Sequence, residues 1–180
     1  AVVDGWMKDP ALGKYAVWVQ NLLIYKPHQL SDELEKFLHE QHVVGSAAWN
    51  RLFDETMAGL RFPMDGPEGT KELTSAEALH LLSDPSTDVR KAAAHSLGKV
   101  FTKNLPLFAR ITNTLAKDKE IEDRWRQFPR PVSSRNMANQ VEDEVVDALV
   151  KAVRDSCPNL SHRYYALKAK WMGSDKLDYW

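Results

Sequence analysis

The longest periodic segment of the chain is residues 84–115, which read DPSTDVRKAAAHSLGKVFTKNLPLFARITNTL. Its apolar side chains recur every three or four residues, the spacing of one face of an α-helix: Val89, Ala93, Leu97, Phe101, Leu105, Phe108, Ile111 and Leu115. The phase continues through Pro106, although a proline inside a helix costs about 3 kcal/mol and usually kinks it. We therefore predict one long helix that begins after Asp84-Pro85, continues to about Arg126, and has a kink or a break near Asn104.

Helical spacing also occurs on both sides of this segment, and proline, glycine and capping residues mark the limits of each helix. On the N-terminal side we expect helices at residues 10–26, 31–44 and 46–59. A capping box, Thr74-Ser75-Ala76-Glu77, begins a short helix that ends near Leu82. After a linker at residues 128–131, we expect one helix that ends at Cys157-Pro158 and a last one that stops at Gly173.

Alternating side chains predict a single β-hairpin. Leu60, Phe62 and Met64 alternate with more polar neighbours, and a turn cluster at residues 65–69 precedes a return strand at 71–73. The predicted fold class is mainly all-α, with about seven helices in an antiparallel array and one short β-hairpin near residues 60–73. We divide the chain into a helical hairpin region (1–60), the β-hairpin (60–74) and a long-helix region (75–180).

Composition excludes several classes of protein. The 180 residues include 24 basic and 25 acidic ones, so the net charge is −1, which argues against a bulk polyanion binder. No apolar run approaches the roughly 18 residues of a membrane span, and charges at residues 4, 8 and 9 interrupt any signal-peptide core. A single cysteine, Cys157, excludes an intramolecular disulfide and fits a reducing compartment. We expect a cytoplasmic protein with no membrane or nucleic-acid partner.

The ends of the chain are unusual. There are six tryptophans, no initial methionine, and a final Tyr179-Trp180 with no polar tail after it. Chain termini ordinarily fray, so large aromatic residues are unexpected there. We expect both ends to be cut points of a longer protein.

His39-Glu40-Gln41-His42 has some likeness to the His-Glu-x-x-His motif of zinc proteases. That motif places two imidazoles four residues apart on one helix face, with the glutamate as general base. Here the histidines are three residues apart, and no third ligand is marked. We interpret the match as false and expect a solvated helix end.

Residues 81–98 resemble one HEAT-type repeat, with the core Asp-Pro…Val-Arg-x-x-Ala-Ala at 84–94. A helical solenoid needs at least about three repeats to bury its faces. We find no second copy, so a local likeness is the preferred interpretation. A HEAT-like scaffold that binds a protein partner remains the alternative.

Residues 124–135 interleave arginines with Trp125 and Phe128, as a single-stranded nucleic-acid binder would. Glu120, Glu122 and Asp123 precede them and cancel the local field. We prefer a structural role, in which the arginines pair with carboxylates and both aromatic side chains enter the core.

The remaining reactive residues form no catalytic pattern. Cys157 lies at the negative end of a predicted helix, where a thiolate is not favoured. Ser161-His162 has no evident acid partner. The acidic residues Glu142, Asp143, Glu144 and Asp147 fit a helix N-terminus and do not indicate a metal site. We therefore assign no catalytic, cofactor-binding or metal residues to this chain.

Seven stretches, in this order and at these spacings, point to a known family: residues 49–56 (WNRLFDET), 60–63 (LRFP), 111–119 (ITNTLAKDK), 121–126 (IEDRWR), 134–136 (SRN), 138–142 (ANQVE) and 160–170 (LSHRYYALKAK). Together they resemble the region upstream of the catalytic core in bacterial oligoendopeptidase F. This family belongs with the thimet-oligopeptidase-like zinc metallopeptidases. The resemblance extends from about Asp9 to Trp180.

The resemblance implies a cytoplasmic zinc endopeptidase that hydrolyses short oligopeptides inside a channel enclosed by helical lobes. It implies that zinc is held by a His-Glu-x-x-His helix and a further glutamate, none of which has a matching position here. This chain would then be a wall or lid of the channel, inactive and metal-free by itself, with the missing catalytic domain as its partner. We also expect self-association, because aromatic residues such as Tyr164, Tyr165, Trp171, Tyr179 and Trp180 would lack that domain.

Overall fold

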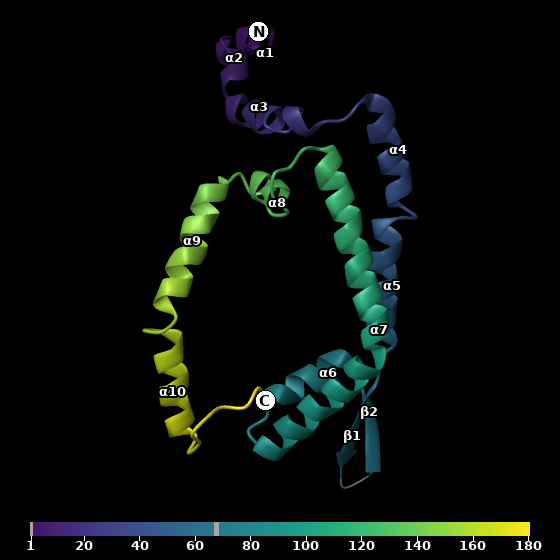
Figure 1. The fold of residues 1–180 in the computed structure, drawn as a ribbon, viewed down its shortest axis with the longest axis vertical. Coiled ribbons are helices and arrows are strands. Elements are labelled where there is room, and N and C mark those ends of the chain that lie inside the picture. Colours follow the sequence, from purple (N-terminus) through teal and green to yellow (C-terminus); the bar gives the residue numbers. More distant parts are fainter. Residues whose placement is uncertain (1, 67–68) are drawn as a thin grey trace. The chain divides into compact units, whose positions relative to one another are not determined.

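A computed structural model describes residues 2–66 and 69–180 (Figure 1). The described residues form α-helices, two short 3₁₀-helices and one antiparallel hairpin, so the predicted mainly helical fold with a single hairpin is confirmed. The chain divides into two compact units. The first unit comprises Ala1–His39 with Lys119–Asp155, and the second unit comprises Glu40–Asp118 with Ser156–Trp180.

Both stretches of chain that make up the first unit are helical. Its N-terminal part has α1 (Val2–Trp6), α2 (Pro10–Gly13), α3 (Ala16–Leu23), the 3₁₀-helix η1 (Lys26–His28) and most of α4 (Asp32–His42). Its second part has the end of α7 (Thr87–Trp125), α8 (Ser133–Ala138) and α9 (Asp143–Ser156). The helix predicted at residues 10–26 is wrong as a single element. It breaks between α2 and α3, after Gly13, the residue type least favourable in a helix interior apart from proline.

The second unit is built around the hairpin. Strands β1 (Phe62–Gly66) and β2 (Gly69–Leu73) pair with Phe62 opposite Leu73, and Pro67 and Glu68 of the predicted turn lie outside the described residues. Before the hairpin comes α5 (Ser46–Gly59), and after it come α6 (Ser75–His80), the 3₁₀-helix η2 (Leu81–Ser83) and α7. The C-terminal helix is α10 (Ser161–Trp171). The predicted capping box is confirmed, since Thr74 and Glu77 exchange both of its hydrogen bonds.

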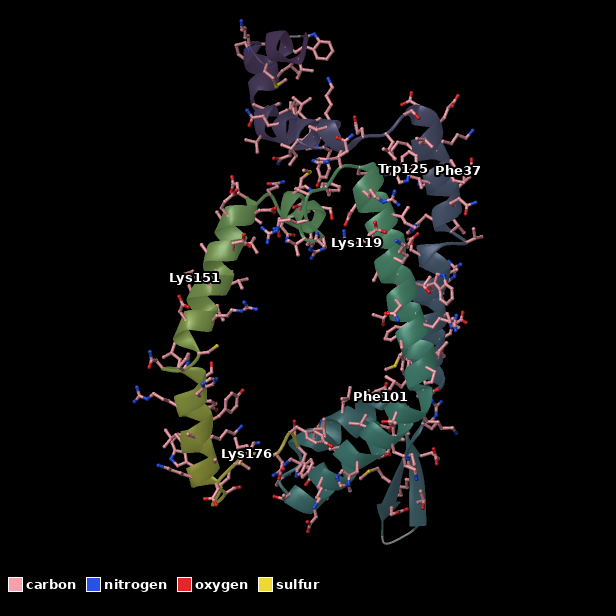
Figure 2. The ribbon with its side chains drawn as sticks, in the orientation of Figure 1. Phe37, Phe101, Lys119, Trp125, Lys151 and Lys176 are labelled. Carbon is pink, nitrogen blue, oxygen red and sulfur yellow. The ribbon has the colours of Figure 1, made fainter. Side chains whose placement is uncertain are left out.

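The small core of the second unit lies where the hairpin meets α6 and the first half of α7. Phe62, Ala78 and Leu97 are buried, and partly buried apolar side chains pack around them: Leu60, Leu73, Leu82, Val100 and Phe101. The Phe62 and Phe101 rings meet edge to face with centroids 5.4 Å apart, and Phe101 is labelled in Figure 2. Ser96 Oγ donates to the carbonyl oxygen of Pro63 at 2.7 Å, which ties the strand to the helix.

The long helix α7 is continuous through Pro106, and Figure 1 shows that it changes direction partway along. Pro106 has no N–H, so the hydrogen bond that a helix normally makes to the carbonyl of Thr102 is missing. The side chain of Asn104 donates to the carbonyl oxygen of Val100 at 2.9 Å beside this gap. Of the two outcomes predicted near Asn104, the structure therefore has the kink and not the break.

Candidate functional site

The residues that resemble a zinc motif are not assembled into a metal site. Across residues 2–66 and 69–180, no group of three or more His, Cys, Asp or Glu side chains is arranged to hold a metal ion. His42 Nδ1 lies 3.0 Å from Ser46 Oγ, one helical turn further along the chain. The described donor set therefore does not fit the zinc of a metallopeptidase.

The arginine-rich segment forms a hydrogen-bonded polar site in the first unit. Arg126 Nη1 and Nη2 donate to the two carboxylate oxygens of Glu35 at 2.7 and 2.9 Å, and Arg126 Nε donates to Glu122 at 2.7 Å. Arg126 Nη1 also donates to the carbonyl oxygen of His28 at 3.1 Å. The His28 ring in turn donates from Nδ1 to the carbonyl oxygen of Arg126 at 2.7 Å and stacks on Phe128 at 4.0 Å. We call His28, Glu35, Arg126 and Phe128 the Arg126 clasp.

The clasp is electrostatically stable near neutral pH. The hydrogen bonds from Arg126, together with that from the backbone N–H of Leu30, lower the pKa of Glu35 to about 2. The same bond to Glu35 raises the pKa of Arg126, which stays charged. A guanidinium that is already satisfied by two carboxylates has little capacity left for a phosphate.

Two other arginines of this segment, Arg124 and Arg130, are also paired with carboxylates. Arg130 forms a fork with the two carboxylate oxygens of Asp147 at 2.8 Å each, and Arg124 Nε donates to Glu120 at 3.2 Å. The predicted pairing of arginines with carboxylates is thus confirmed. Trp125, labelled in Figure 2 at the end of α7, is 56% exposed, so the prediction that it enters the core is wrong.

The acidic residues at the start of α9 act as capping and pairing groups. Asp143 accepts hydrogen bonds from Ser133 Oγ at 2.7 Å and Asn136 Nδ2 at 2.8 Å. The bond from Asn136, followed by that from Ser133, lowers the pKa of the Asp143 carboxyl. These contacts join α8 to α9. Because α8 was not predicted, the sequence did not reveal what these acids bind.

Cys157, Ser161 and His162 lie at the connection between α9 and α10. Cys157 is half-buried and its carbonyl oxygen accepts from the backbone N–H of His162 at 3.0 Å, while Ser161 and His162 are exposed. These residues therefore define the turn between α9 and α10.

Exposed apolar side chains are a further feature of the structure, as the sequence led us to expect near the C-terminal aromatic residues. The chain exposes 14041 Å². A compact protein of 20.5 kDa exposes roughly 8,900 Å², and two separate compact domains of half that mass would expose roughly 10,700 Å² together. The exposed area of the chain is larger than both of these reference values. Trp171 and Tyr179, 71% and 76% exposed, are among the large side chains that contribute to it.

The second unit has two hollows on its surface. One of about 460 Å³ lies between α5 and the bend of α7 and is lined by Phe53, Met57, Gly98, Phe101, Thr102, Leu105 and Phe108. The other, of about 560 Å³, lies between α10 and residues 175–180. Trp180 itself packs edge to face on His95, with centroids 5.5 Å apart, and Lys91 Nζ lies 5.7 Å from its ring. None of the helices in the described part of the chain is long and apolar enough to span a membrane.

Comparisons with known proteins agree with the sequence resemblance. A family model described as Oligopeptidase F matches residues 1–62, and one described as HEAT repeat matches residues 77–103. Group B oligopeptidase PepB of Streptococcus agalactiae is 28% identical over 173 residues, which are 95% of this chain and 29% of the relative. An oligoendopeptidase F homolog of Borreliella burgdorferi is 22% identical over 97% of this chain and 29% of its own length.

A solved structure supports the fold. Oligoendopeptidase-F from Enterococcus faecium matches 99% of this chain and 34% of its own chain with a TM-score of 0.83 and 24% identity. The chain therefore spans about three tenths of the curated relatives that it matches. Together these comparisons confirm that the chain resembles the N-terminal region of oligoendopeptidase F over nearly its whole length.

Proposed function

We propose that this chain is the helical N-terminal segment of a zinc-dependent oligoendopeptidase F-like enzyme that hydrolyses short oligopeptides in the cytoplasm. The segment has an architectural role as a wall or lid of the peptide channel, and the catalytic part of the same polypeptide is its partner. The observation that carries the proposal is the match of 95% of this chain to 29% of a curated oligopeptidase.

The surface of the chain supports an architectural role. An excess of roughly 3,300 Å² over two compact domains is close to twice the area that a standard protein–protein interface buries in total. Large apolar side chains are part of this exposed surface, and such side chains often mark surfaces that pack against other protein. The proposal assigns that covering protein to the remainder of the enzyme.

The chemistry is assigned to residues outside this chain. A catalytic zinc needs three protein ligands and an open position for water, and the described residues offer no such group. When bound in the complete enzyme, the zinc would lower the pKa of its water and polarise the peptide carbonyl. In this chain, residues contribute shape and packing, and no residue is given a catalytic role.

The proposal is tested with the purified 180-residue chain. We expect less than a tenth of a zinc ion per chain by elemental analysis after desalting, an order-of-magnitude limit for a chain without a ligand set, and no cleavage of a quenched fluorescent oligopeptide. A His39→Ala, His42→Ala variant is the matched control and should behave identically. One tightly bound zinc per chain, or cleavage that a chelator abolishes, would overturn the assignment of the chemistry to another part of the enzyme.

A HEAT-like scaffold is the second candidate, because a HEAT model matches residues 77–103. That match is shorter than one repeat of roughly 40 residues, and a solenoid needs at least about three. In the structure these residues form α6, η2 and the first part of α7, which pack on the hairpin and not on another repeat. A second Asp-Pro…Val-Arg…Ala-Ala segment elsewhere in the native polypeptide would favour this candidate over the peptidase.

A further inference from the structure

We define residues 2–25 as the N-terminal arm, and none of its side chains whose burial the structure describes is buried. None of the residues of α2, α3 or η1 is buried, and large apolar side chains of α3, including Trp18 and Leu22, are more than half exposed. Helices in proteins are normally held by the packing of an apolar face. The attachment of this arm therefore has to come from other contacts.

The Arg126 clasp supplies such an attachment. It begins at His28, three residues beyond the arm, and its hydrogen bonds and ring contact join this point to the end of α7, about 100 residues away in the sequence. Glu35 reinforces the junction from α4, because it accepts both from Arg126 and from the backbone N–H of Leu30 at 3.0 Å. The Arg126 guanidinium therefore contacts residues on both sides of the loop between η1 and α4, namely His28 and Glu35.

The α7 side of the clasp is rigidly positioned. Gln127 has φ of 59°, and the backbone N–H groups of Gln127 and Phe128 donate to the carbonyls of Arg124 and Asp123 at 3.2 and 2.9 Å. This is the Schellman arrangement that ends a helix, usually with glycine in the left-handed position. A glutamine there is held at some conformational cost, which indicates that the surrounding contacts determine this turn.

We propose that the Arg126 clasp is a releasable latch, and that the arm swings about residues 26–31 when the latch opens. Its polar contacts are partly solvated, with the Arg126 and Glu35 side chains 19% and 37% exposed, so the latch opens without exposing a buried core. In the proposed peptidase, which this step presupposes, the arm is the movable part of the wall or lid.

Hydrogen–deuterium exchange of the purified chain tests the latch. Arg126→Lys keeps the charge but cannot form the fork with Glu35, so exchange in residues 10–25 should become about fivefold faster or more. His28→Phe keeps a ring to stack on Phe128 but loses the bond to the Arg126 carbonyl, and a smaller increase is expected. Arg130→Lys is the matched control, because it disrupts a similar fork that does not touch the arm.

Two results would overturn the latch. One is a rate of hydrogen–deuterium exchange in the arm that is the same in the wild type, Arg126→Lys and His28→Phe. Protection of residues 89–101 of α7 in all three proteins would show that each of them is folded. The other is an equal increase in Arg130→Lys, which would show a general loosening. Failure of the native polypeptide to hydrolyse peptides would overturn the proposed function and leave the exchange result intact, so the two failures can be told apart.

Discussion

At the scale of single residues, the stability of the second unit depends on Phe62. Its side chain has no exposed surface and contacts Phe101 edge to face, and it is the largest fully buried side chain among the described residues. Loss of a buried phenylalanine removes its transfer free energy and leaves a cavity.

We predict that Phe62→Ala lowers the free energy of unfolding by about 3–5 kcal/mol. Urea denaturation followed by circular dichroism measures this change. Leu79→Ala on α6 is the control, since Leu79 is half exposed and its loss should change stability by about 0.5 kcal/mol or less. A Phe62→Ala change as small as that of the control would show that the hairpin does not anchor this unit.

The Glu35–Arg126 pair makes a second residue-scale prediction. Because the carboxyl pKa is about 2 in the folded chain and 4.5 ordinarily, the pair stabilises the fold fully above about pH 5, and its contribution falls as the pH drops from 4.5 toward 2. Solvent screening limits the coupling in a double-mutant cycle of Glu35→Gln and Arg126→Gln to about 1 kcal/mol near neutral pH.

The measurement is the urea-unfolding cycle repeated at several pH values. The coupling should be constant between about pH 6 and 8 and should approach zero near pH 2. A coupling that is absent at neutral pH, or that grows as the pH falls, would contradict the ion pair. The Arg130–Asp147 fork provides a comparison pair in the same unit.

At the scale of elements, the bend in α7 is assigned to Pro106. The proline removes one backbone hydrogen bond, and its ring clashes with the preceding turn. We predict that Pro106→Ala straightens α7, so that two spin labels at residues 88 and 118 move further apart. Double electron–electron resonance reports this distance, and Leu105→Ala, one residue away, serves as the control. An unchanged distance in Pro106→Ala would mean that packing against α5 imposes the bend.

The elements that the sequence revealed are those with local signals. Helical spacing from Val89 to Leu115, the Thr74–Glu77 capping box and the alternation at Phe62 each depend on residues a few positions apart, and all three are present in the structure. The break after Gly13 and the short helix α8 have weak local signals, because four to six residues contain little periodicity.

The contacts of the Arg126 clasp could not be predicted from the sequence because they join residues that are far apart in the chain. Pairing of the arginines with carboxylates was expected, but Arg126 and Glu35 are 91 residues apart in the sequence, and nothing local marks one as the partner of the other. The glutamates at 120 and 122 were the natural candidates by proximity. Only the folded chain shows that Arg126 uses Glu122 and Glu35 together.

At the scale of the whole chain, exposed apolar surface governs behaviour in solution. We predict that the purified chain self-associates, with a weight-average mass in sedimentation velocity that rises with concentration. Replacement of two exposed side chains on different helices, Leu22→Lys and Leu149→Lys, should reduce the association. A chain that stays monomeric across the concentration range would contradict the view that these faces need a covering protein.

The proposed function assigns the catalytic residues of a zinc oligopeptidase to a part of the polypeptide outside residues 1–180. The most direct test is to express the complete native reading frame that contains residues 1–180 and to measure zinc content and oligopeptide hydrolysis together. We predict a His-Glu-x-x-His helix outside residues 1–180, about one zinc per polypeptide, and cleavage of short peptides that a chelator abolishes. A complete polypeptide without that motif, or a folded one with neither zinc nor cleavage, would contradict it.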